Sequence, residues 1–75
     1  MDVAGYVRDL KAHVEGRAFI NQAELCRYVG CGKATARELL EGVPFLAIGN
    51  QKRYVIRDVA KALKERELTL YWSES

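Results

Sequence analysis

Apolar residues recur every three or four positions over the first part of the chain, at Val3, Tyr6, Val7, Leu10 and Val14. That spacing places them on one face of a helix. The pattern therefore predicts an amphipathic helix over residues 3–14, which Gly16 closes. An apolar run at 18–20 follows and is expected to form a short strand.

A second helix is predicted to begin at Asn21, because Asn21 and Glu24 have the spacing of a capping box. It is expected to end at Gly30. Its inward face is predicted to carry three residues, Leu25, Cys26 and Val29.

A third helix is predicted from about Lys33 to Glu41, with Gly42 as its stop. Its apolar stripe consists of Ala36, Leu39 and Leu40. The segment Gly30-Cys31-Gly32 separates it from the second helix. Two short helices joined by a tight turn that contains glycine are typical of a helix-turn-helix.

The remaining chain predicts a hairpin and a last helix. The apolar runs FLAI and RYVI flank the polar turn 49–52, so a hairpin is expected over residues 45–56. Asp58 is expected to open a helix that runs to about Glu67, with Val59 and Leu63 facing inward. In the tail, Leu68, Leu70 and Trp72 alternate with other residues, which suggests an extra strand.

These elements predict one α+β domain that is mainly helical. With 75 residues, the chain is near the lower size at which a single core is stable. A hairpin that follows a helix-turn-helix is the layout of a winged helix. The prediction is thus a winged helix-turn-helix core at 20–67 with an added N-terminal helix in 1–17 and a tail at 68–75. No apolar run approaches the ~18 residues of a membrane span, and residues 1–14 do not resemble a secretion signal, so a cytoplasmic location is expected.

The net charge of +2 is unevenly distributed. Residues 1–30 carry four basic and four acidic side chains, whereas residues 31–57 carry five basic and two acidic ones. The excess positive charge therefore lies on the third helix and the hairpin, the two elements that a winged helix presents to duplex DNA.

The start of the third helix differs from the other helix starts, because it has no acid and carries Lys33 in its first turn. A lysine there is mildly unfavourable for an isolated helix. Free backbone amides beside a cation suit an incoming phosphate. The alternative is a poorly capped helix with a solvated lysine, and the surrounding motif favours the anion site.

The segment from Ile20 to Leu63 resembles the MerR-like winged helix of small phage and transposon excisionases. The resemblance rests on four short motifs: Gly30-Cys31-Gly32 at the turn, Lys33-Ala34-Thr35-Ala36-Arg37 at the start of the third helix, Lys52-Arg53-Tyr54 on the returning strand, and Arg57-Asp58-Val59 at the entry to the last helix. Two departures are Gly32 in place of the usual serine and the added N-terminal helix.

The resemblance implies a DNA-contacting role for three residues of the third helix, which would act as the recognition helix. Lys33 and Thr35 would meet DNA at its N-terminus. Arg37, one turn further on, would reach a base edge or a phosphate, and arginine can bind guanine through two hydrogen bonds.

The resemblance also implies contacts from the hairpin, which would act as the wing. Lys52 and Arg53 would lie beside a minor groove or its phosphates. Tyr54 would either donate its hydroxyl to a phosphate or pack on the core. Arg57 would either contribute to the contact or neutralise Asp58.

The sequence does not favour a metal site, a cofactor site or catalysis. Cys26 and Cys31 lack the other ligands of a structural zinc site, both are predicted on core faces, and a disulfide is rare in the cytoplasm. The only serines, Ser73 and Ser75, lie in the tail, and GCGK is too short for a phosphate-binding loop. No catalytic, metal or cofactor residue is therefore assigned, and the protein is not expected to be an enzyme.

The combined prediction is a protein that binds double-stranded DNA and regulates transcription or site-specific recombination. Because one small module recognises few base pairs, a homodimer or a cooperative array on DNA is also expected, through the N-terminal helix or the tail. The alternative is a protein-interaction adaptor that uses a winged-helix scaffold, with Leu70, Tyr71 and Trp72 as the contact.

Overall fold

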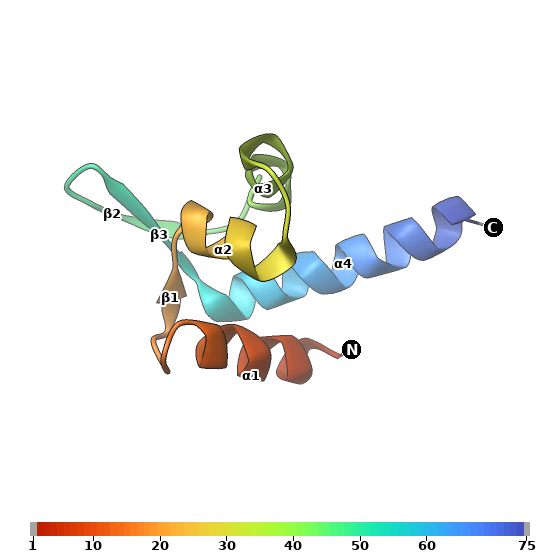
Figure 1. Ribbon diagram of the computed structural model, residues 1–75, viewed down its shortest axis with the longest axis horizontal. Coiled ribbons are helices and arrows are strands. Elements are labelled where there is room, and N and C mark those ends of the chain that lie inside the picture. Colours follow the sequence, from red (N-terminus) through yellow and green to blue (C-terminus); the bar gives the residue numbers. More distant parts are fainter. Residues whose placement is uncertain (1, 75) are drawn as a thin grey trace.

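A computed structural model of the chain describes residues 2–74, and it describes side chains through residue 67. Within residues 2–74 the chain forms four helices and one three-stranded antiparallel sheet (Figure 1). The mainly helical α+β class is therefore confirmed. The elements are, in chain order, α1 (Val3–His13), β1 (Phe19–Ile20), α2 (Gln22–Val29), α3 (Lys33–Leu39), β2 (Phe45–Ile48), β3 (Gln51–Val55) and α4 (Ile56–Glu74).

The sheet has the strand order β1-β3-β2, so β3 is central and β2 lies at an edge. Tyr54 of β3 is paired with Ile20 on one side and Phe45 on the other. The predicted short strand and hairpin are thus confirmed. The turn is tighter than expected, because β3 already begins at Gln51 and Gly49, with φ of 61°, supplies the positive dihedral that a two-residue hairpin needs.

Helix α2 begins and ends as the sequence predicts. Asn21 and Glu24 form a complete capping box, and Gly30 closes the helix in the left-handed conformation. Only residues 30–32 separate α2 from α3. At the start of α3, Gly32 provides no side-chain hydrogen bond to the helix, so the first backbone amides of α3 have no side-chain cap.

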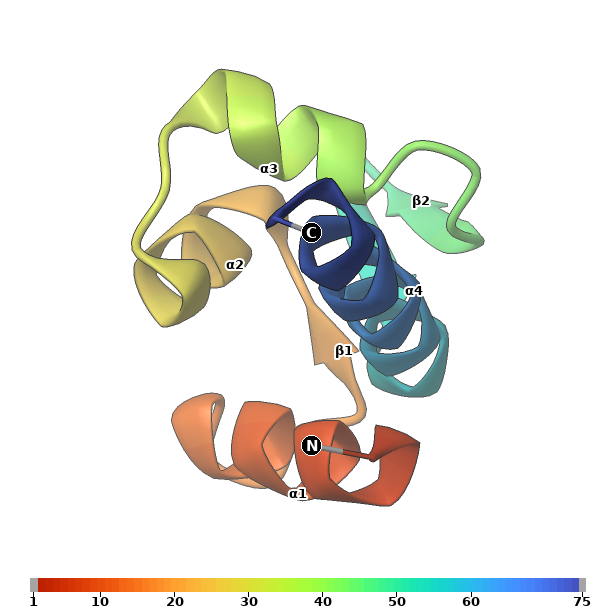
Figure 2. The same cartoon turned by 90° about the vertical axis from the view of Figure 1, so that its right-hand side faces the viewer.

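The core contains side chains from both the helices and the sheet. Leu10 of α1, Ile20 of β1, Leu25 of α2 and Val59 of α4 are at most 1% exposed. Helix α1 packs against α4, and both views show α1 and α3 on opposite sides of the body, with α2 and α4 between them (Figures 1 and 2). This arrangement leaves the outer side of α3 uncovered by α1.

The predicted strand in the tail is wrong, because α4 continues as a helix to Glu74. The segment after Ile56 contains no glycine or proline and is rich in Ala, Leu, Lys, Glu and Arg, which are strong helix formers. A helix already packed on α1 therefore extends through a tail whose own alternation suggested a strand. The same helix begins at Ile56, two residues before the predicted Asp58. The side chains of the tail lie outside the described residues.

The predicted inward face of α2 is wrong in part. Leu25 is buried, but Cys26 is only half-buried and Val29 is 41% exposed. The inward face instead passes through Leu25 and Tyr28, three residues apart, and Tyr28 packs against the core. Cys31, in the turn, is also half-buried. Neither cysteine is therefore a buried core residue.

Candidate nucleic-acid interface

Helix α3 divides its residues between the core and solvent. Ala36 and Leu39 are buried, and they hold the helix against the body. Lys33, Thr35 and Arg37 are exposed. Lys33 and Arg37 are four residues apart and therefore lie on the same face of the helix. The structure thus presents two cations of α3 side by side on its outer surface.

Arg37 lines a hollow between α2, α3 and the hairpin. The first residues of α2 form one wall, and Asn50, Gln51 and Lys52 form the other. Gln22 joins the two helices at this point, since its side-chain amide donates to the carbonyl of Lys33 at 3.4 Å. The described lining of this hollow contains two cations and no carboxylate; it consists of Asn21, Gln22, Ala23, Arg37, Asn50, Gln51, Lys52 and Tyr54. We call this surface the α2–α3–hairpin groove.

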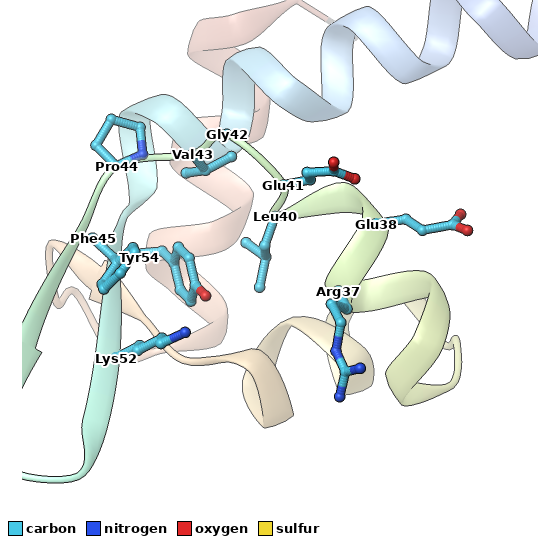
Figure 3. Close-up of a pocket in the computed structure, with 10 residues that line it drawn as sticks. All are labelled: Arg37, Glu38, Leu40, Glu41, Gly42, Val43, Pro44, Phe45, Lys52 and Tyr54. Atoms are coloured by element: carbon cyan, nitrogen blue, oxygen red, sulfur yellow. The ribbon is translucent and has the colours of Figure 1, made fainter.

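A second hollow continues the first toward the C-terminal end of α3 (Figure 3). Arg37, Lys52 and Tyr54 line both hollows. Two acids, Glu38 and Glu41, also border the second one, but their carboxylates point away from Lys52 and Tyr54. The cations therefore face the shared part of the groove, and the acids lie on its outer margin.

The two basic residues of β3 lie on opposite faces of the hairpin, because successive residues of a strand alternate. Lys52 is on the same face as Tyr54, and its ammonium lies 5.0 Å from the centre of the Phe45 ring. Arg53 is on the other face, across from Leu46, and donates to the side chain of Gln51 at 3.0 Å. The structure brings Lys52 and Arg37 to one groove and does not bring Arg53 there.

Tyr54 packs in the core, which was one of the two interpretations of its role. It is 8% exposed, and its ring centre lies 5.5 Å from that of Phe45. Figure 3 shows its hydroxyl pointing into the space between Lys52 and Leu40. The ring is therefore structural, whereas the hydroxyl reaches the groove.

Two further predicted residues lie elsewhere. Thr35 lines an apolar groove on the α4 side of α3, together with Tyr6, Val29 and Leu63. Arg57 lies on the first turn of α4, in a separate hollow that also contains Lys11 and Lys61. Thr35 and Arg57 are thus separated from the surface shared by Arg37 and Lys52.

Three polar residues that complete the groove are not part of any motif recognised in the sequence, namely Gln22, Asn50 and Gln51. They carry no charge, and Asn21 beside them was recognised only as a helix cap. The available signal was the run of amides in the hairpin turn, which a winged helix would expose together with the lysine.

The single acid near the start of α2 is neutralised. Burial would raise the pKa of Glu24, but the backbone N–H of Asn21, which donates to it at 3.1 Å, and an ion pair with Arg17 outweigh this effect. The net result is a lowered pKa and a carboxylate already paired with a cation. This acid therefore adds little negative potential to the adjacent groove.

The described residues hold no cluster of three or more potential metal ligands among His, Cys, Asp and Glu. No helix in the described part of the chain combines the length and apolar character that crossing a membrane requires. No protein-family model, curated protein or solved structure matches this chain.

Proposed function

We propose that this chain is a winged helix-turn-helix protein of the MerR-like, excisionase-like type that binds duplex DNA. The observation that carries the proposal is the α2–α3–hairpin groove. Cations from two separate elements, Arg37 and Lys52, converge there with side-chain amides and without a carboxylate among the residues that line it. Such a surface attracts phosphate and presents hydrogen-bond donors to it.

The dimensions of the elements fit this proposal. An α-helix with its side chains is about 10–12 Å across, so α3 would fit a major groove that is about 12 Å wide. The hairpin lies beside it and would follow the adjacent backbone. The expected task is regulation of transcription or of site-specific recombination.

The test is binding of a fluorescent random-sequence duplex, followed by anisotropy at increasing salt. The proposal expects binding that weakens steeply with salt, since phosphate contacts release counterions. Arg37→Ala and Lys52→Ala should each weaken it. Lys61→Ala is the matched control, because Lys61 is exposed on α4 in a different hollow. Equal losses in all three variants would mean that binding follows overall charge and that the groove is not the interface.

A protein-interaction adaptor remains the second candidate, and one observation favours it. The edge strand β2 exposes three large apolar side chains, Phe45, Leu46 and Ile48, by 46–56%. An exposed apolar edge strand is a common site for pairing with another chain. The contact first predicted for an adaptor, at residues 70–72, lies outside the described side chains. Absence of any duplex binding at low salt would favour the adaptor.

A further inference from the structure

The turn between α2 and α3 is built on the carbonyl of Cys26. The backbone N–H groups of Gly30 and Cys31 both donate to it, at 2.8 and 3.1 Å. Gly30 has φ of 78°, and the bond from Cys31 spans five residues, as in a Schellman motif. In that motif the side chains of the two residues joined by the longer bond commonly touch. Here both of these residues are cysteines.

The backbone brings the two cysteines within reach of a disulfide. The bonded oxygen of Cys26 lies about 2.4 Å from its own Cα, and the nitrogen of Cys31 lies about 1.5 Å from its Cα. With the 3.1 Å hydrogen bond between them, the two Cα atoms are at most about 7 Å apart, which is the upper limit for bridging. The Cys26 side chain is also close enough to Cys31 to raise the pKa of the Cys31 thiol.

Both thiols are accessible to a small reagent, because both cysteines are only half-buried. The expectation that they have no role in a disulfide depended on a cytoplasmic location and on their lying on core faces, and the structure corrects the second of these points. Intracellular disulfides, where they occur, are usually transient and redox-sensing. An accessible pair of cysteines that the backbone holds within bridging distance therefore has the geometry that such chemistry needs.

We propose that Cys26 and Cys31 form a dithiol modification site that closes to an intramolecular disulfide by exchange with a low-molecular-weight disulfide such as oxidised glutathione. One cysteine thiolate attacks the glutathione disulfide, forms a mixed disulfide and releases one glutathione thiolate. The second cysteine then attacks the protein sulfur of the mixed disulfide and releases the other glutathione. The two thiol protons end on the two glutathione molecules, and the protein loses two electrons to them.

The surroundings of Cys31 affect how the exchange depends on pH. Desolvation, followed by the contact with Cys26, raises the pKa of the Cys31 thiol. A raised pKa means that less of the reactive thiolate forms at Cys31 at a given pH. The exchange should therefore accelerate as the pH rises.

The disulfide would displace the start of α3. A disulfide holds its sulfurs about 2.05 Å apart, closer than two contacting thiols, so it draws Cys31 toward α2. Lys33, the first residue of α3, follows only two residues later. The consequence for DNA rests on the proposed function: a displaced α3 start should weaken duplex binding about five- to tenfold, at the low end of usual coupling between sites.

The experiment is a redox titration of the full chain in mixtures of reduced and oxidised glutathione at pH 8, quenched with acid and analysed by mass. The wild type is expected to end two hydrogens lighter, without an intermolecular disulfide and free of glutathione. Cys26→Ser and Cys31→Ser should stop at the mixed disulfide. A wild type that stays reduced, keeps bound glutathione or forms only intermolecular dimers would overturn the proposal without any variant.

The DNA arm compares oxidised and reduced wild type on one duplex, with the double variant Cys26→Ser/Cys31→Ser as the control that oxidant should not affect. A five- to tenfold weakening confined to the wild type supports the effect on α3. Unchanged binding after complete closure overturns that effect. Because the mass measurement uses no DNA, failure of the proposed function is distinguishable from failure of the disulfide.

Discussion

Under the proposed function, the loss of Arg37 or Lys33 should affect DNA binding most directly. Both are exposed on α3, so Arg37→Ala and Lys33→Ala should leave the free energy of unfolding within about 0.5 kcal/mol of wild type. If Arg37 contacts a base, its loss should cost about 1–3 kcal/mol of binding and relax preference at one position. The measurement is anisotropy on a duplex selected from a random pool. Wild-type affinity in both variants would remove α3 as the recognition helix.

Lys52 and Arg53 should differ, although they are neighbours in the sequence. Lys52 faces the α2–α3–hairpin groove, and Arg53 faces away from it. Lys52→Ala should lower the slope of log affinity against log salt by about one, as for one lost phosphate contact, whereas Arg53→Ala should change it less. Each variant is the control for the other. An equal decrease of the salt slope from the wild-type value in both variants would show that both faces of the hairpin contact DNA.

At the scale of single residues, the sequence was informative where the spacing of residues alone decides which face of a helix or strand a side chain occupies. Spacing of four placed Lys33 and Arg37 on one helix face. Lys52 and Arg53 were both expected beside the DNA, although strand alternation puts them on opposite faces of the hairpin. The roles of Tyr54, Cys26 and Val29 depend on which elements pack around them. That information comes from contacts between segments distant in the chain, so a local pattern does not contain it.

The link between α1 and α4 predicts how the two helices respond to pH. Tyr6 donates its hydroxyl to Glu67, and this bond raises the pKa of Tyr6 to about 12 and lowers that of Glu67 to about 2. The stability that ionised Glu67 contributes is fully present above pH 4.5, the ordinary pKa of this group. It is lost as the pH falls toward 2. The stability that the protonated Tyr6 hydroxyl contributes is fully present below pH 10, the ordinary pKa of this group. It is lost as the pH rises toward 12.

The measurement is urea unfolding at several pH values for the wild type and Tyr6→Phe. The variant keeps the ring in place and removes the donor. We expect the difference in stability between the two proteins to be largest between pH 5 and 9 and to shrink in both outer windows. A constant difference across this range would show that the bond does not link α1 to α4.

The stability of the turn between α2 and α3 should depend more on Gly30 than on Gly32. Gly30 has φ of 78°, and no atom lies within 4 Å of an added Cβ, so Gly30→Ala isolates the backbone conformation. We expect a loss of about 1–2 kcal/mol in the free energy of unfolding. Gly32, with φ of −83° and equally open surroundings, is the matched control, and Gly32→Ala should cost less. Equal losses in the free energy of unfolding in the two variants, measured by urea unfolding, would contradict the role of the left-handed cap.

Among the elements, those with local signals were predictable. The capping box, the glycine stops and the two apolar runs each mark a boundary, and the helices and strands at these places were found. The end of α4 was not, because residues 68–72 alternate in a way that suits a strand when viewed alone. A helix that is already formed upstream extends at little cost, so the neighbouring segment overrides the local pattern.

At the scale of the whole molecule, self-association is expected to involve the end of α4 and not α1. Leu10 and Val14 are at most 1% exposed, so the apolar stripe of α1 is used in the core. Deletion of residues 68–75 should leave the fold intact and reduce the mass in solution or the cooperativity on DNA. Light scattering and titration of binding stoichiometry measure both. An unchanged mass and cooperativity in a folded truncated protein would exclude this segment.

The pairing of α1 with α4 also constrains how the chain is made. Residues in α1 complete their burial only against a helix that begins at Ile56, more than 40 residues after the end of α1 at His13. During synthesis, Leu10 therefore has no complete core to enter until most of α4 has left the ribosome. The first three quarters of the chain should remain exposed to proteases and chaperones until then, and the domain should form in one late step.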